Sequence, residues 1–164
     1  MIKNMAQFVD PKDRSNVLEL VKNILAADES SPYMAQFIAI IRLLSKWVSE
    51  NDFILLEVLN FLAKSLTKKD LGEAAARALK NLCSYCHRQM LPYLADLFNI
   101  VENLNSFNLS EEGESYMIKA ILEAISSLPI DQFLVSMQKL CDIQIKKIQK
   151  FKNLSSQLYI EQLA

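Results

Sequence analysis

The stretch that decides the fold is PYMAQFIAIIRLLSKWVSENDFILLEVLNFLAKSL (residues 32–66). Its apolar side chains recur every three or four residues, first from Ile38 to Val48 and then from Leu55 to Leu66. This spacing places each set on one face of an α-helix. The stretch therefore predicts two consecutive amphipathic helices.

Signals for the start of a helix return along the chain at nearly even spacing. Ser31-Pro32 offers an N-cap and a first-turn proline, Asp70 to Glu73 has the D-x-x-E form of a capping box, and Ser110 precedes two glutamates. Pro32, Asp70 and Ser110 are 38 and 40 residues apart, and each opens a long helix followed by a second one. Repeats of about 40 residues made of two helices are typical of HEAT solenoids, in which each pair buries its apolar face on the next.

These patterns predict an all-α fold, namely an α-α superhelix (ARM/HEAT-repeat solenoid) of antiparallel helix pairs. A compact bundle of eight helices is the alternative, and it predicts no fixed period. We expect one segment over 1–164 with repeats at about 32–66, 70–105 and 110–151, flanked by partial repeats at 1–27 and 154–164. The predicted helices are 15–27, 32–49, 52–66, 70–87, 90–105, 111–127, 130–151 and 154–163.

The composition favours helices and argues against several classes of protein. Only 2 residues are Gly, whereas about 7% is usual, so tight turns are scarce. A net charge of -1 argues against a nucleic-acid binder that depends on phosphate neutralisation. The longest apolar stretch, Phe37 to Leu44, is interrupted by Arg42 and is too short to span a membrane. Three cysteines and no signal peptide at the start predict a reducing compartment, the cytosol or the nucleus.

Polar side chains follow one face of each second helix of the predicted pairs. Such stripes can line the concave surface of a solenoid, where a partner protein binds. A merely solvated helix face is the alternative. The candidate partner-facing residues are Glu57, Asn60, Lys64, Asp96, Asn99, Asn103, Lys139, Lys146 and Lys150, with Gln132 and Ser136 on the same face of the last helix.

The motif CSYCH, from Cys83 to His87, matches the C-x-x-C-H pattern of covalent haem attachment and contains a C-x-x-C pair. His87 is the single histidine, so no second axial ligand of that type exists. Cys83 falls near a predicted helix C-terminus, where the helix dipole raises the pKa of a thiol. Zinc is equally disfavoured, because Cys141 is the one remaining soft ligand. We interpret Cys83 and Cys86 as core residues and expect no catalytic residue, no cofactor, no metal and no enzymatic activity.

The basic segment IQIKKIQKFK (143–152) is amphipathic, and such helices can bind membranes or enter calmodulin-like grooves. The simpler interpretation is the end of a solenoid helix. Ile145, Ile148 and Phe151 would then face the core, and the lysines would face water or an acidic partner.

A family resemblance runs from about Ser15 to Phe151. It is carried by IIRLLSKWVSEN (40–51), AAARALKNLCSYCHRQM (74–90), LNSFNLSEEGE (104–114) and SSLPIDQFLVSMQKLCDIQI (126–145). These stretches resemble the middle of the transportin-SR (transportin-3-like) receptors, a branch of the importin-β (karyopherin) superfamily. Importin-13 is similar too, but less so in the central block.

The resemblance implies a nuclear import receptor that shuttles between cytoplasm and nucleus, carries serine/arginine-rich splicing factors and releases them when Ran-GTP binds. Receptors of this family are several-fold longer, so it also implies an internal fragment, with the Ran and cargo sites outside it. From the charge and the short apolar stretches described above, we expect no direct contact with nucleic acid or membrane. The alternative function is a HEAT-type scaffold or adaptor subunit without Ran dependence. A fragment would expose the apolar faces of its terminal repeats, so we expect self-association.

Overall fold

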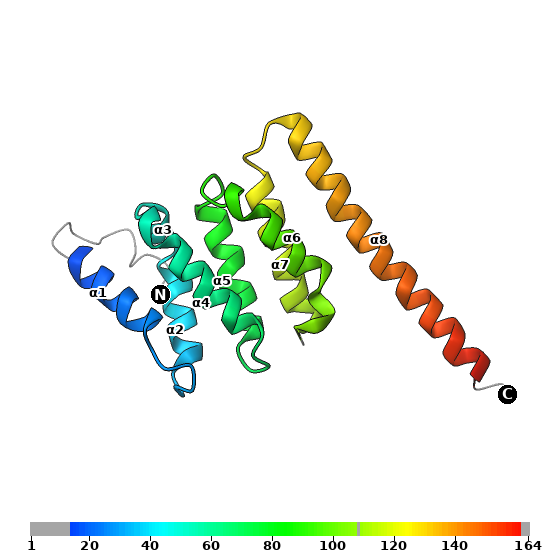
Figure 1. Cartoon of the computed structure of the whole chain (residues 1–164), viewed down its shortest axis with the longest axis horizontal. Helices are drawn as coiled ribbons and strands as arrows, with labels where there is room; N and C mark the ends of the chain where they lie inside the picture. Colours follow the sequence, from blue (N-terminus) through cyan, green and yellow to red (C-terminus); the bar gives the residue numbers. More distant parts are fainter. Residues whose placement is uncertain (1–13, 108, 162–164) are drawn as a thin grey trace, which may run out of the picture. The chain divides into compact units, whose positions relative to one another are not determined.

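The computed structural model describes residues 14–107 and 109–161, and this part of the chain is helical and contains no strand (Figure 1). The α-helices are α1 (Arg14–Leu25), α2 (Met34–Leu43), α3 (Ser45–Ser49), α4 (Leu55–Leu66), α5 (Gly72–Tyr85), α6 (Leu94–Glu102), α7 (Glu111–Ile125) and α8 (Ile130–Glu161). Short 3₁₀ turns lie at Asp52–Ile54, Leu91–Tyr93 and Leu104–Ser106. The predicted all-α class is confirmed.

The chain forms two compact units that divide between Ser127 and Leu128. The first unit contains α1 to α7, and the second contains α8. Among the described residues, no helix combines the length and the apolar character needed to cross a membrane. The predicted single segment over 1–164 and its repeat boundaries stay predictions.

Helix α5 is the centre of the first unit, because it contacts α2, α3 and α4 from the preceding repeat and α7 from the next. The small side chains of Ala75, Ala76 and Ala78 are fully buried on it, as is Leu82. Side chains of this size let several helices approach α5 at once. The first helices of successive repeats, α2, α5 and α7, therefore lie side by side, while α4 contacts α5 and α6 contacts α7 (Figure 1).

Hydrogen bonds between neighbouring repeats join residues that are nearly one repeat apart. The sequence separations of four such bonds are 39, 40, 37 and 40 residues. The bonds are Lys68 Nζ to Glu29 O (3.0 Å), Gln89 Nε2 to Ser49 O (3.1 Å), Ser110 Oγ to Glu73 Oε2 (2.6 Å) and Ser127 Oγ to His87 O (3.4 Å). These separations match the period of 38 and 40 residues between the start signals in the sequence.

The start signals in the sequence have different outcomes. Ser110 is the N-cap of α7, and its Oγ accepts a hydrogen bond from the Gly113 N–H at 3.1 Å, as predicted. The capping box at Asp70 is wrong, because α5 begins at Gly72 after Leu71 and no side chain caps it. The reason is a backbone turn in which the Gly72 N–H already donates to the Lys68 carbonyl at 2.8 Å.

Several predicted helices have different bounds. The predicted helix 32–49 is interrupted at Leu44, and α2 begins at Met34 because the preceding turn is closed by the Ser31 oxygens. The predicted break between 151 and 154 is wrong. Helix α8 continues to Glu161, since no Gly or Pro lies between Ile130 and Glu161 to stop it.

Candidate partner-binding surface

A pocket of about 400 Å³ opens on the first unit, between the α1–α2 connection and α4. Its apolar lining comes from Leu25, Ala27, Met34 and Phe61. Its polar lining comes from Glu29, Glu57, Asn60, Lys64, Ser65 and Lys68. The structure thus brings three of the predicted partner-facing residues, those on α4, to one pocket.

The helical spacing of α4 explains why its polar residues reach the pocket together. Glu57, Asn60, Phe61 and Lys64 are three or four residues apart and so share one face of the helix. The opposite face, which includes Leu62, is buried in the core. The polar face of α4 is therefore turned to solvent by the burial of its apolar face.

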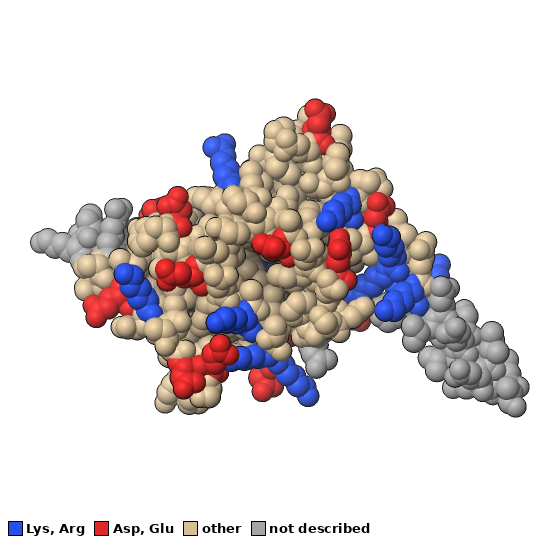
Figure 2. Space-filling model, viewed as in Figure 1, with Lys and Arg blue, Asp and Glu red and all other residues tan. Residues whose placement is uncertain are grey.

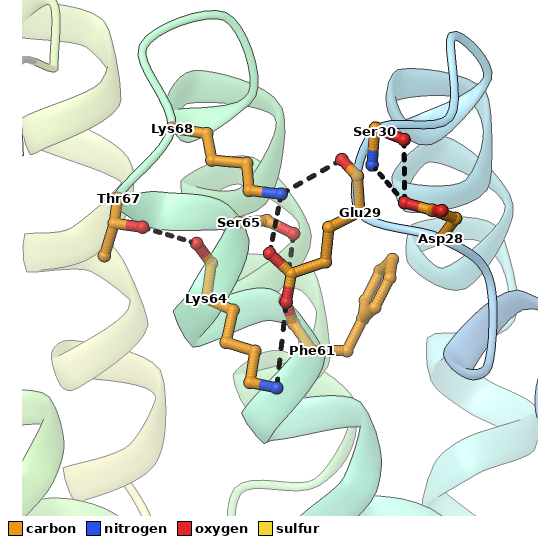
Figure 3. Close-up of polar contacts among 8 residues, drawn as sticks. All are labelled: Asp28, Glu29, Ser30, Phe61, Lys64, Ser65, Thr67 and Lys68. Carbon is orange, nitrogen blue, oxygen red and sulfur yellow. Dashed lines mark hydrogen bonds and ion pairs between the residues drawn. The ribbon is translucent and has the colours of Figure 1, made fainter.

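Two lysines hold the carboxylate of Glu29 at one end of the pocket (Figure 3). Lys68 Nζ lies 2.9 Å from Glu29 Oε2 and also donates to the Glu29 backbone carbonyl at 3.0 Å. Lys64 Nζ lies 3.8 Å from Glu29 Oε1. The hydrogen bond from Lys68, together with the positive charges of Lys68 and Lys64, lowers the pKa of Glu29.

The connection that carries Glu29 is held in a turn by its own side chains (Figure 3). Asp28 Oδ1 accepts hydrogen bonds from the Ser30 N–H at 2.8 Å and from Ser30 Oγ at 2.7 Å. These bonds lower the pKa of Asp28. The turn fixes the backbone on both sides of Glu29 and so presents its carboxylate to α4.

At the other end of the pocket, Glu57 and Asn60 are exposed. Within the described part of the chain, no lysine or arginine forms an ion pair with Glu57. The pocket therefore has two lysines, Lys64 and Lys68, that bind Glu29 at one end, and the solvent-exposed carboxylate of Glu57 at the other.

The remaining candidate residues do not line this pocket. Asp96 and Asn99 are exposed on α6, and the exposed Asn103, the C-cap residue of that helix, donates from its side chain to the Asn99 carbonyl at 2.8 Å. The lysines at 139, 146 and 150 are exposed on α8, with Gln132. In the space-filling view, acidic and basic side chains are interspersed on the face shown (Figure 2). The continuous polar stripe across all repeats stays a prediction.

The basic segment of α8 departs from its predicted orientation. Ile145 and Ile148, expected to face the core, are 50% and 56% exposed. Leu140 on the same helix is 4% exposed, so the buried apolar side chain of α8 lies before the basic segment and not within it. The side chain of Phe151 lies outside the described residues.

The cysteine motif is part of the core. Cys83 and Cys86 are fully buried, as predicted, while Cys141 is exposed. Burial raises the pKa of the Cys83 thiol, with a smaller contribution from Cys86, and burial raises the pKa of Cys86 to about 12. In the described residues, no cluster of His, Cys, Asp or Glu could hold a metal ion. Thiols in this state are poor nucleophiles, because the thiolate is the reactive form.

Comparison with known families places the helix pairs in a wider group. Residues 15–100, which run from the start of α1 into α6, match the family model described as the third TPR domain of transportin-3 and importin-13. The chain belongs to this transportin-3/importin-13 family. The expected resemblance is confirmed at that level, and the model covers both branches together.

One curated relative is Transportin MOS14 of Arabidopsis thaliana, which is 27% identical over 152 residues. The match covers 85% of this chain and 15% of the relative. The chain thus spans about 15% of the length of this transportin. All residues that line the pocket lie between 25 and 68, inside the region that matches the family's third TPR domain.

The repeats of this chain are longer than typical TPR repeats. Separations of 37 to 40 residues between hydrogen-bonded partners exceed the roughly 34 residues of a typical TPR repeat and approach the length of a HEAT repeat. Both repeat types stack pairs of antiparallel helices.

Proposed function

We propose that this chain is a segment of a nuclear import receptor that acts by binding proteins and not by catalysis. The observation that carries the proposal is the match of residues 15–100 to the transportin-3/importin-13 family. The stacked helices support it, because helical repeats create extended surfaces on which another protein can lie.

The cargo and its control are proposed from the resemblance in the sequence. We propose that the whole receptor carries serine/arginine-rich splicing factors into the nucleus, releases them to Ran-GTP and shuttles between nucleus and cytoplasm. Ran and cargo contact mainly repeats outside these 164 residues. The polar face of α4 is a contribution of this segment to partner binding.

An immunoblot with an antibody against this chain gives the size of the natural protein. That protein, purified, is then added to permeabilised cells with a fluorescent serine/arginine-rich domain as cargo. We expect the cargo to accumulate in the nucleus only when the receptor is present. We also expect the receptor to lose its cargo when Ran loaded with a non-hydrolysable GTP analogue is added. Cargo binding that does not change when Ran-GTP is added would favour the scaffold or adaptor function. Absence of both import and cargo binding would refute the proposal.

A further inference from the structure

The pocket between the α1–α2 connection and α4 is called the α4 pocket below. At its cationic end, Lys64 and Lys68 bind the Glu29 carboxylate, which a carboxylate of a partner can replace. The side chains of Glu29, Lys64 and Lys68 are 58%, 72% and 32% exposed. Exposed ion pairs of this kind contribute little to stability, because water and salt screen both charges. The Glu29 carboxylate therefore marks a site whose geometry suits a carboxylate but which holds it weakly.

The opposite end of the pocket has the reverse charge. Glu57 precedes Lys64 by seven residues on α4, which corresponds to about 10 Å along a helix axis. The apolar lining contributed by Met34 and Phe61 is part of the same pocket. Met34 is 4% exposed and already belongs to the core, whereas Phe61 is half-buried, so an apolar side chain placed against Phe61 would cover apolar surface that is now hydrated.

We propose that this pocket binds an extended segment of a partner protein in which an acidic residue, an apolar residue and a basic residue follow within one short stretch. The acidic side chain replaces Glu29 at Lys64 and Lys68, the apolar side chain contacts Met34 and Phe61, and the basic one pairs with Glu57. Three residues of extended chain cover about 10 Å, which matches the rise of α4 from Glu57 to Lys64. Such a pocket serves a scaffold as well as a transport receptor, so the inference is independent of the proposed transport role.

The test is an NMR titration of the isotope-labelled 164-residue chain with the blocked hexapeptide GKLAEG. Its lysine and glutamate are three residues apart. We expect shifts confined to the amides of α4 and of the α1–α2 connection. Glu29→Gln removes the built-in competitor and tightens binding by a factor of about two to five, the range that corresponds to loss of one exposed ion pair. The control peptide GKLAQG, without the carboxylate, binds more weakly.

The matched variants are Lys64→Glu, Lys68→Gln and Lys69→Glu. The side chain of Lys64 is 72% exposed, more than that of Glu29 or Lys68, so its reversal leaves the fold intact, and we expect it to abolish binding. Lys68→Gln removes the close contact to the carboxylate without reversing charge, and we expect weaker binding. Lys69 is exposed beside the pocket but does not line it, so Lys69→Glu leaves the affinity unchanged.

Three results would overturn the proposal. Equal loss of affinity in Lys69→Glu and Lys64→Glu would mean diffuse electrostatic attraction. Unchanged affinity in Glu29→Gln would mean that Glu29 does not compete for the site. Binding of a phosphoserine peptide, GKLA-phosphoserine-G, without binding of GKLAEG would assign the lysines to phosphate instead of carboxylate.

Discussion

The two glycines of the chain lie in the first turns of α5 and α7, and alanine at each position tests how closely the repeats pack. A Cβ added at Gly72 would lie 2.8 Å from Leu109 Cδ2 and 3.1 Å from the Leu66 carbonyl oxygen. A Cβ added at Gly113 would lie 3.2 Å from Leu109 Cβ. The two substitutions add the same atom, and they differ only in the space that receives it.

The expected free energies follow from those distances. Carbon atoms in ordinary contact are about 3.5 to 4.0 Å apart. Leu109 can rotate away from Gly72, but the Leu66 carbonyl belongs to the last turn of α4 and cannot. Overpacking costs about 1 to 3 kcal/mol, and alanine gains at most about 1 kcal/mol over glycine in a helix. Gly72→Ala therefore destabilises the first unit by up to about 2 kcal/mol, while Gly113→Ala leaves stability within about 0.5 kcal/mol.

Urea unfolding followed by tryptophan fluorescence measures this difference. Trp47 is the single tryptophan, lies in the first unit and is 4% exposed, so its emission reports unfolding of that unit. The midpoint should fall for Gly72→Ala with an unchanged denaturant slope. The melting temperature should fall by about 2 to 4 °C for each kcal/mol. If Gly72→Ala were as stable as Gly113→Ala, the close approach of Leu66 and Leu109 to α5 would be refuted.

Four further outcomes are expected. Leu79→Ala removes a side chain that is 2% exposed on α5 and should lower the free energy of unfolding in urea by about 2 to 5 kcal/mol. Ser110→Ala removes the cap of α7 and should cost about 1 kcal/mol in the same assay, and an unchanged midpoint would contradict the cap. A thiol reagent near neutral pH should label Cys141 at once and Cys83 and Cys86 only after unfolding, so a second fast thiol in the native chain would contradict their burial. Burial raises the pKa of Cys86 from 9.0 to about 12, so as the pH rises the unfolded chain loses the thiol proton before the folded chain does. The free energy of unfolding should therefore fall as the pH rises from 9.0 toward 12. Cys86→Ala should reduce this pH dependence.

The helices were predictable because their signals are local. Apolar spacing from Ile38 to Val48 and the hydroxyl of Ser110 act within one or two helical turns; Ser110 caps α7 as predicted, and the apolar stretch is helical except for the break at Leu44. The false signal at Asp70 shows the limit of local patterns. The start of α5 is set by the turn from Lys68 to Gly72, and the space at Gly72 is set by Leu109, which lies far along the chain.

The sequence predicted one of the two walls of the pocket, the polar face of α4. The polar face of α4 followed from residue spacing alone, since burial of its apolar face leaves few orientations for Glu57 and Lys64. The part contributed by the α1–α2 connection was missed, because no periodic pattern positions a loop. A signal for Glu29 did exist, since it precedes its partner Lys68 by 39 residues, which is nearly one repeat.

The hydrogen bonds between repeats also decide between a solenoid and a bundle for the first unit. Glu29 and Lys68 both precede a first helix, and Ser49 and Gln89 both follow one, so each bond joins equivalent positions of successive repeats. A bundle without a period gives no reason for equivalent positions to meet. In a solenoid they must meet, because each repeat is the previous one shifted along the axis. The acidic group at one end of the pocket beside α4 therefore comes from the connection that precedes α2, and the equivalent position of the next repeat supplies its partner Lys68.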